Sequence, residues 1–206
     1  MNPELVKQQM ANAYSEKARD YGVVRNSKFD AFLKTEVQHF VALVKPVGNI
    51  VLDIGSGPGN EGVRLRDAGL KPVCIDNAPG MVTECLNKGL EAYVMDFYKL
   101  KFADDSFSGA WMAFSLLHVP KDQAGAVIKE ASRVLATNGI FYVSLFEGEG
   151  EGLRTEDLSR FGCERYFAYY SQKEITKLLL PYFKVITASR LDISPRPTIS
   201  FICSKL

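Results

Sequence analysis

The sequence predicts an open α/β sheet of seven mostly parallel strands, with helices on both faces and an antiparallel hairpin at the carboxyl end. Short apolar runs alternate with amphipathic segments of helical length over residues 49–146, a pattern typical of a parallel sheet. Two further strand-like runs follow near the carboxyl end with no helix between them, which favours a hairpin. No linker or internal repeat interrupts the 206 residues, so we expect one domain with segments 1–48, 49–146 and 147–206.

The first segment, residues 1–48, has the character of two helices. Residues 4–20 are polar with few apolar positions, so any helix here is amphipathic and weakly held. From Ser27 onward, apolar side chains recur at spacings of three and four residues, which indicates a better-packed helix. Pro46 and Gly48 are expected to end it.

The middle segment alternates buried strands with helices. Strands are predicted at residues 49–55, 72–76, 92–96, 109–114 and 140–146. Helices are predicted at residues 58–68, 79–88 and 121–136, with a turn at Asn138 and Gly139 before the fifth strand.

The last segment combines loop, helix and strand signals. The alternating glutamates and glycines of residues 147–152 predict a loop. Ser171 and Glu174 form a capping-box pattern, which predicts a helix from this point to about Leu180. Residues 183–190 and 198–205 are the two strands of the expected hairpin.

The composition is that of a soluble globular protein. Twenty-five basic residues face 24 acidic ones, so there is no excess of positive charge for nucleic acid, which argues weakly against such a partner. No apolar run is long enough to span a bilayer, so we expect no membrane partner. The four cysteines at positions 74, 85, 163 and 203 are scattered, which favours a reducing compartment without disulfides or a structural zinc.

The ends of the sequence bear on its location. The first residues lack the apolar core of a secretory signal, so we expect a cytoplasmic protein. The last three residues, Ser204-Lys205-Leu206, match the peroxisomal address in a host that has peroxisomes. The alternative is that they are simply the polar end of the last strand. The sequence does not distinguish a monomer from a homodimer.

The most informative stretch is VLDIGSGPGNEG at residues 51–62, where a predicted strand turns into a helix. Gly55, Gly57 and Gly59 permit positive φ and allow a ligand to approach the backbone. Asp76 follows 21 residues after Gly55, at the end of the next strand, where a carboxylate can accept hydrogen bonds from a ribose diol. Together these features predict an adenosine-containing ligand; the alternative is a tight turn and an unrelated surface acid.

The spacing of the glycines narrows the ligand class. Dinucleotide loops place their third glycine five residues after the first, whereas these three glycines fall at every second position. Asp53 directly precedes the loop, and its carboxylate would repel a pyrophosphate but suit an ammonium group. The expected ligand is therefore zwitterionic and lacks phosphates, which disfavours a nicotinamide-dependent oxidoreductase.

Several motifs in order resemble those of class I S-adenosylmethionine-dependent methyltransferases. They are DIGSGPG, the acid of VCIDNAPGMV, the segment MDFYKLKFADDSFSGAWMAFSLLHVP, and KEASRVLATNGIFYVS. The resemblance covers about residues 49–146 and is strongest to the group that includes the ubiquinone and menaquinone C-methyltransferases. It implies a Rossmann-like sheet that binds S-adenosylmethionine and releases S-adenosylhomocysteine. Segment 1–48 would then be a helical lid, 49–146 the cofactor-binding core and 147–206 the substrate side.

The resemblance also implies a role for individual residues. The methionine part of the cofactor would lie on Asp53, Gly55, Ser56 and Gly57, with Asp53 acting largely through water. Asp76 would bind the ribose, Asn77, Met81 and Phe97 would flank the adenine, and Asp96 would accept from its N6 amine. Phe114 would line the sulfonium end, and Tyr14 and Tyr21 would close over the cofactor or serve only as packing residues.

The acceptor side is less constrained. His118 is the candidate general base, with a structural or cofactor-orienting role as the alternative. Arg154, Arg165 and Tyr166 are the candidate substrate residues, because an arginine among aromatic side chains suits a ring or acyl compound that carries an anion. We predict no metal site, since no histidine or further acid joins Glu147, Glu149 and Glu151.

The predicted function is therefore methyl transfer to a small molecule by in-line displacement. Nucleic-acid amino methyltransferases carry a Pro-Pro segment after the fourth strand, and cytosine C5 enzymes carry a Pro-Cys there. This sequence has neither, which disfavours both classes. The alternative is a non-enzymatic or regulatory protein that binds the cofactor on the same fold without turnover. The acceptor atom is left open.

Overall fold

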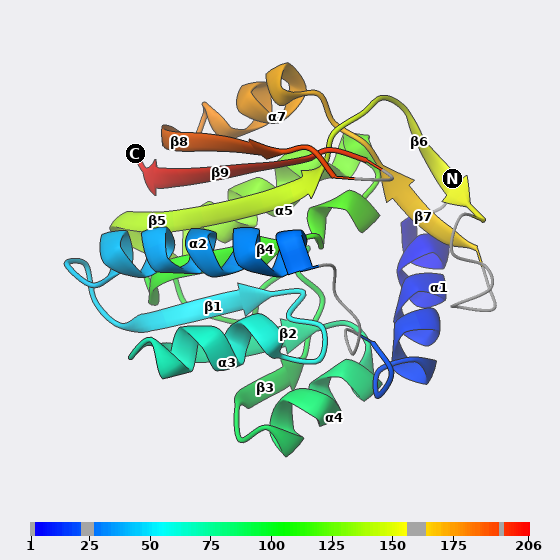
Figure 1. Ribbon diagram of the computed structural model, residues 1–206, viewed down its shortest axis with the longest axis horizontal. Helices are drawn as coiled ribbons and strands as arrows, with labels where there is room; N and C mark the ends of the chain where they lie inside the picture. The colour runs from blue at the N-terminus through cyan, green and yellow to red at the C-terminus, as the bar shows by residue number, and fades with distance from the viewer. Residues whose placement is uncertain (1–2, 22–26, 156–163, 194–195) are drawn as a thin grey trace.

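The computed structural model describes residues 3–21, 27–155, 164–193 and 196–206 (Figure 1). Its helices are α1 (Pro3–Glu16), α2 (Ser27–Val44), α3 (Asn60–Asp67), α4 (Pro79–Asn87), η1 (Leu116–His118), α5 (Lys121–Val134) and α7 (Gln172–Leu179). Its strands are β1 (Ile50–Ile54), β2 (Lys71–Asp76), β3 (Glu91–Val94), β4 (Phe107–Ala113), β5 (Leu135–Phe146), β6 (Glu151–Arg154), β7 (Arg165–Ala168), β8 (Phe183–Leu191) and β9 (Thr198–Lys205).

Seven strands form one sheet in the order β3-β2-β1-β4-β5-β9-β8. Strands β1 to β5 pair in parallel, and β9 pairs antiparallel with both β5 and β8. This confirms the predicted open sheet with its antiparallel hairpin. The strand order reverses between β1 and β4, and ligands of such sheets bind at the carboxyl ends of the strands at this point.

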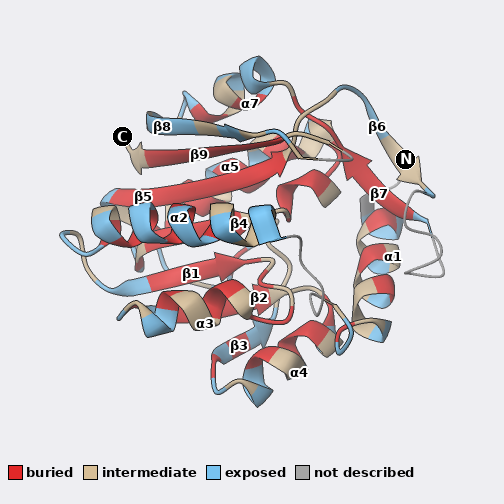
Figure 2. Ribbon diagram, viewed as in Figure 1, coloured by how far each residue is buried: buried red, intermediate tan, exposed pale blue. Residues whose placement is uncertain are grey.

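Helices cover both faces of the sheet (Figure 1). On one face, the apolar side of α2 packs with α3 on Val51, Trp111 and Tyr142, while α4 packs on Cys74. On the other face, α5 and α7 cover side chains of β1, β4 and β5. The central strands are buried on both faces (Figure 2), as their nearly continuous apolar runs predict.

The amino-terminal helix α1 lies across the carboxyl ends of the strands, beside β7 and α4 (Figure 1). The sequence predicts only a weakly held helix here, yet Val6, Met10 and Ala13 are buried. Polar contacts supplement this narrow apolar face, because the Gly80 amide donates to Ser15 Oγ at 3.0 Å. The helix is thus docked at the ligand-binding edge of the sheet.

Three local predictions are wrong. The helix predicted to residue 136 ends at Val134, and Asn138 and Gly139 do not separate it from the next strand but form an irregularity within β5. Asn138 has a φ of 61°, which its short polar side chain tolerates. The predicted loop 147–152 already contains the start of β6, which pairs with β7 in a second, two-stranded sheet. Strands β6 and β7 have four residues each, so an alternation of apolar and polar residues is too short to predict them from the sequence.

No helix within the described ranges has both the length and the hydropathy that crossing a bilayer requires. Ser204 and Lys205 belong to β9, where the Lys205 ammonium bonds to Asp105 Oδ1 at 2.8 Å. Leu206 follows the strand and is exposed.

Candidate active site

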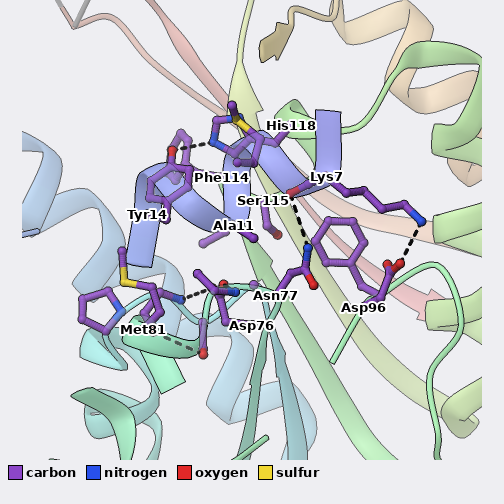
Figure 3. A pocket seen from close by; sticks show the side chains of 18 of the residues that line it. Lys7, Ala11, Tyr14, Asp76, Asn77, Met81, Asp96, Phe114, Ser115 and His118 are labelled. Atoms are coloured by element: carbon purple, nitrogen blue, oxygen red, sulfur yellow. Dashed lines mark hydrogen bonds and ion pairs between the residues drawn. The ribbon is translucent and has the colours of Figure 1, made fainter. Parts of the chain in front are cut away.

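A cavity lies where the strand order reverses, between the carboxyl ends of the strands and α1 (Figure 3). Its empty volume is about 880 Å³, counting the part open to solvent, which suits a ligand of drug-like size. Its lining residues come from α1, the loops after β1 to β4, and η1: Lys7, Met10, Ala11, Tyr14, Tyr21, Gly55, Ser56, Gly57, Pro58, Glu61, Asp76, Asn77, Ala78, Met81, Asp96, Phe97, Tyr98, Ala113, Phe114, Ser115 and His118.

The glycine loop after β1 forms one wall of this cavity. Gly55, Gly57 and Gly59 have φ values of 68°, 54° and 79°, a left-handed conformation that favours glycine. A Cβ on Gly55 would lie 2.3 Å from the Ser115 Cβ, so glycine is also needed for close packing. A Cβ on Gly57 would instead point into the cavity, and among the described residues only Tyr21 would lie within 4.0 Å of it. The backbone is therefore open to a ligand at Gly57.

Asp76, the last residue of β2, lies beside this loop. Its Oδ2 accepts from the Gly57 amide at 2.9 Å and its Oδ1 from the Ala78 amide at 2.8 Å. Burial raises the pKa of Asp76 to about 6, although these backbone hydrogen bonds oppose the shift. A carboxylate held in this way, with lone pairs remaining toward a cavity, is suited to accept hydrogen bonds from ligand hydroxyls.

Asp96 occupies the next position along the cavity, just beyond β3. Its Oδ1 accepts from the Tyr98 amide at 2.9 Å and its Oδ2 from the Lys7 ammonium at 2.8 Å. The rings of Phe97 and Tyr98 stack at 5.5 Å beside it. Flat apolar surface next to a hydrogen-bond acceptor fits a heterocyclic base that carries an amino group.

Phe114 and Ser115 follow β4 on the opposite side of the glycine loop. Phe114 has a φ of 56°, an uncommon conformation for a bulky residue, and its amide donates to the Ser144 carbonyl at 2.9 Å. Its ring contacts those of Phe29 and Phe146 at centroid distances of 5.1 and 5.3 Å. Strained residues cluster at functional sites, and this one places an aromatic surface in the cavity.

A chain of hydrogen bonds closes the cavity near His118. The Arg165 Nη1 donates to the Tyr14 hydroxyl at 2.7 Å, and this hydroxyl lies 2.7 Å from His118 Nε2 (Figure 3). His118 Nδ1 lies 2.7 Å from the Tyr166 carbonyl oxygen. The chain links α1, η1 and β7, which are far apart in the sequence.

The protonation state of His118 follows from these partners. Burial lowers the pKa of His118 to about 3, which the bond to the Tyr166 carbonyl only partly offsets, so the ring is neutral at pH 7. A carbonyl can only accept, so Nδ1 carries the proton and Nε2 accepts from the Tyr14 hydroxyl. Both ring nitrogens are therefore engaged, and neither offers a free lone pair to a substrate.

Most of the sequence-predicted cofactor residues meet in this one cavity. Eleven line it: Tyr14, Tyr21, Gly55, Ser56, Gly57, Asp76, Asn77, Met81, Asp96, Phe97 and Phe114. Asp53 does not; it is buried beneath the glycine loop, where desolvation first and the nearby Glu61 second raise its pKa well above the ordinary value. A direct contact between Asp53 and a ligand is therefore not part of this geometry.

The three predicted substrate residues also lie outside the cavity lining. Arg165 and Tyr166 reach it only through Tyr14 and His118, as described above. The Tyr166 hydroxyl donates to Glu151 Oε2, and Arg154 packs over the Tyr169 ring at 5.6 Å. Residues 156–163 of the predicted far wall lie outside the described residues. The roles of these three side chains stay a prediction.

Helix α1 supplies more of the cavity lining than Tyr14, the one residue of this helix that the sequence predicts for the site. Lys7, Met10 and Ala11 line the cavity with Tyr14, and Tyr98, Ser115 and Glu61 add to the walls. Positions 7, 10, 11 and 14 share one helical face. Counting back from Tyr14 by three, four and seven residues would therefore have identified Ala11, Met10 and Lys7 as its neighbours on the cavity side of the helix.

Comparisons with known proteins identify the central region. Residues 51–139 match a family model described as a methyltransferase domain. Over these residues, which are less than half of the chain, the sequence is similar to that methyltransferase family. It is 31% identical over 103 residues to a demethylmenaquinone methyltransferase of Corynebacterium glutamicum, an alignment covering 50% of this chain and 44% of that protein. The chain thus spans less than half the length of this relative.

Solved structures share the methyltransferase fold over nearly the whole chain. A magnesium protoporphyrin IX methyltransferase from Synechocystis PCC 6803, with bound S-adenosylmethionine, superposes with a TM-score of 0.74 at 16% identity, covering 98% of this chain and 97% of that one. A 1,6-didemethyltoxoflavin-N1-methyltransferase from Burkholderia thailandensis, with its substrate and S-adenosylhomocysteine, gives 0.73 at 18% identity, covering 100% and 91%. At these identities the likeness establishes the fold alone.

Proposed function

We propose that the cavity binds S-adenosylmethionine and that the protein transfers its methyl group to a small-molecule acceptor. The observation that carries this proposal is the order of groups along one cavity. The left-handed glycine loop comes first, Asp76 follows at the end of β2, and Asp96 with two aromatic rings follows β3. Two of the similar structures hold S-adenosylmethionine or S-adenosylhomocysteine, which supports the same ligand here.

The residues present fit this ligand. The space that a Cβ would occupy at Gly57 is open, so a ligand can contact the loop backbone directly. Asp76 would accept from the ribose hydroxyls, and Asp96 from the adenine amine, with Phe97 against the base. Phe114 and Tyr14 would enclose the end of the cavity near His118, where the methionine part is expected.

S-adenosylmethionine would supply a methyl group already activated by a positively charged sulfur. The protein would then have to align the acceptor and exclude water, and alignment alone contributes several kcal/mol to barrier lowering. The rings of Phe114 and Tyr14 would add cation–π attraction of about 0.5–2 kcal/mol to a nearby sulfonium. Neither role needs a proton acceptor, which suits a cavity whose described lining offers His118 with both ring nitrogens already hydrogen-bonded.

In this proposal His118 has a positioning role and does not take a proton from the acceptor. Its pKa of about 3 and its two engaged nitrogens make it a poor proton acceptor at neutral pH. The acceptor would therefore lose its proton to solvent or reach the site already deprotonated. His118 would instead hold Tyr14, and through it α1, against the cavity.

The acceptor is proposed to be a small molecule with an anionic group. Arg165 does not line the cavity; it is buried beside Tyr14 with its guanidinium 4.8 Å from the Phe167 ring centroid, so its charge would act on an acceptor across the Tyr14 side chain. An arginine beside aromatic rings suits a carboxylate or phenolate attached to a planar skeleton. The expected cytoplasmic location, the absence of nucleic-acid or membrane partners and a monomeric or homodimeric state belong to this same proposal.

Methyl transfer can be tested directly. The protein would be incubated with S-adenosylmethionine labelled in the methyl group and a deproteinised extract of small molecules from the source cells, alongside phenols, carboxylates and amines. We expect label in at least one small molecule, and much less label at the same cofactor concentration when Asp76→Asn replaces the wild type. Binding of the cofactor without any transfer would contradict an enzyme and favour a cofactor-binding protein without turnover.

A further inference from the structure

Lys7 of α1 reaches the base end of the cavity, a position that no sequence motif indicates. Its ammonium donates to Asp96 Oδ2 at 2.8 Å and to Glu4 Oε1 at 2.7 Å (Figure 3 shows the first contact). It also lies 4.1 Å from the centroid of the Tyr98 ring, within cation–π range. A lysine ammonium has three donors, and these three partners account for them. Lys7 therefore acts on a ligand through Asp96.

Asp96 is held at both carboxylate oxygens. The Tyr98 amide fixes Oδ1 and Lys7 fixes Oδ2, so the plane of the carboxylate is set from two sides. Each oxygen keeps a further lone pair, and Asp96 lines the cavity with Phe97 and Tyr98. A carboxylate accepts hydrogen bonds and does not donate them, so it favours a ligand edge with an N–H and disfavours one with a carbonyl.

The charge on Lys7 is stable at neutral pH. Partial burial lowers its pKa, but the hydrogen bonds that Lys7 donates to Asp96 and Glu4 outweigh that effect and leave the pKa raised. The Lys7 side chain is 18% exposed and that of Asp96 is 38% exposed, so the pair is partly shielded from solvent. The backbone oxygen of Lys7 accepts from Asn77 Nδ2 at 3.5 Å, which ties the same turn of α1 to the loop after β2.

We propose that Lys7 is a positioning residue for base selectivity: it orients Asp96 so that the site accepts a 6-aminopurine and rejects a 6-oxopurine. This inference rests on the proposed binding of an S-adenosyl ligand. Helix α1 would then contribute to selectivity for the purine base, in addition to covering the cavity. Loss of the Lys7 ammonium would leave Oδ2 of Asp96 free to turn away from the base.

The test compares S-adenosylhomocysteine with S-inosylhomocysteine, in which the 6-amino group is replaced by a carbonyl and N1 carries a proton. Their dissociation constants would be measured by calorimetry, directly or by displacement, for wild type, Lys7→Met and Lys7→Arg. Lys129→Met, which removes an exposed lysine of α5, is the control. In wild type we expect S-adenosylhomocysteine to bind at least about tenfold more tightly than the inosyl ligand.

Lys7→Met should weaken S-adenosylhomocysteine about fivefold to tenfold and the inosyl ligand less than twofold, so the preference falls. Lys7→Arg keeps a cation for Asp96 and should restore most of the preference. Equal weakening of both ligands by Lys7→Met would overturn the inference, because a role in docking α1 alone predicts that result. Unchanged binding of both would overturn it too. A wild type that binds neither ligand overturns the proposed function, and this inference with it.

Discussion

The two sides of the cavity are built from different kinds of interaction. The floor, Gly55–Gly57 with Asp76, uses backbone groups and one carboxylate from adjacent strands. The roof, Lys7 and Tyr14 of α1, is held by side chains 89 and 104 positions away, Asp96 and His118. A side-chain substitution changes backbone hydrogen bonds little, whereas a single substitution can remove one side-chain hydrogen bond of the roof. We therefore expect the floor to decide the class of ligand that binds, and the roof to adjust its affinity and, through Lys7, the preference for one purine over another.

The largest expected effect belongs to the floor. Asp76→Asn leaves one acceptor oxygen where two serve the Gly57 and Ala78 amides and, in our proposal, the ribose. We expect a loss of about 2–3 kcal/mol in binding free energy, or about 30- to 150-fold in S-adenosylhomocysteine affinity by calorimetry. Asp67→Asn, at the exposed end of α3, is the matched control. Unchanged affinity in Asp76→Asn would remove the ribose assignment.

The second effect is a pH dependence of the same group. The pKa of Asp76 in the free protein is raised to about 6, so below pH 6 a proton competes with the ligand hydroxyls for the carboxylate. Affinity for S-adenosylhomocysteine should fall about tenfold from pH 7 to pH 5. His118, with a pKa of about 3, stays neutral over this range and adds nothing.

The stability of the unliganded protein should change with the opposite sign. Because the folded-state pKa of Asp76 lies above its ordinary value, protonation stabilises the fold, and this contribution is lost as pH rises through about 6. Chemical unfolding and ligand titration across pH 5–8 would measure both trends. Asp76→Asn should flatten the affinity curve and reduce the slope of the stability curve, to which the raised pKa of buried Asp53 also contributes. A wild-type affinity that stays constant from pH 7 to pH 5 would refute the assignment.

A third comparison separates backbone strain from ligand contact. Gly57 and Gly89 both have positive φ, 54° and 70°, so alanine at either should cost about 1–2 kcal/mol of folding free energy. The Cβ would enter the cavity only at Gly57, since Gly89 has open space around it. Gly57→Ala should therefore also lower the affinity for S-adenosylhomocysteine about fivefold, while Gly89→Ala should leave that affinity unchanged. Similar affinities in both variants would mean that the loop backbone does not contact the ligand.

The smallest effect is expected in the roof. An asparagine amide can replace Nδ1 of His118 and a glutamine can replace Nε2, so His118→Gln keeps an acceptor for Tyr14 and His118→Asn does not. We expect about a threefold to fivefold loss of S-adenosylhomocysteine affinity in His118→Asn and less than twofold in His118→Gln. A general base would behave differently: both variants would lose transfer activity while keeping full affinity.

The floor could be predicted from the sequence because its parts are local. A strand, three glycines and a helix follow one another, and Asp76 ends the next strand, so chain order alone brings them to one edge of a parallel sheet. Of the roof, the resemblance predicted Tyr14 but not Lys7, and it did not predict the contacts between residues, because Lys7, Asp96, His118 and Arg165 meet only through the docking of α1 and β7. The strands β6 and β7 were missed for a similar reason: four residues each are too few for a period to stand out.

The central claim is that this cavity binds an S-adenosyl ligand and not a dinucleotide. Parallel calorimetric titrations of the wild-type protein with S-adenosylhomocysteine and NADH at pH 7 test it most directly. We predict binding of S-adenosylhomocysteine in the micromolar range at one site per chain, and no binding of NADH. Binding of NADH alone, or of neither ligand, would contradict the account.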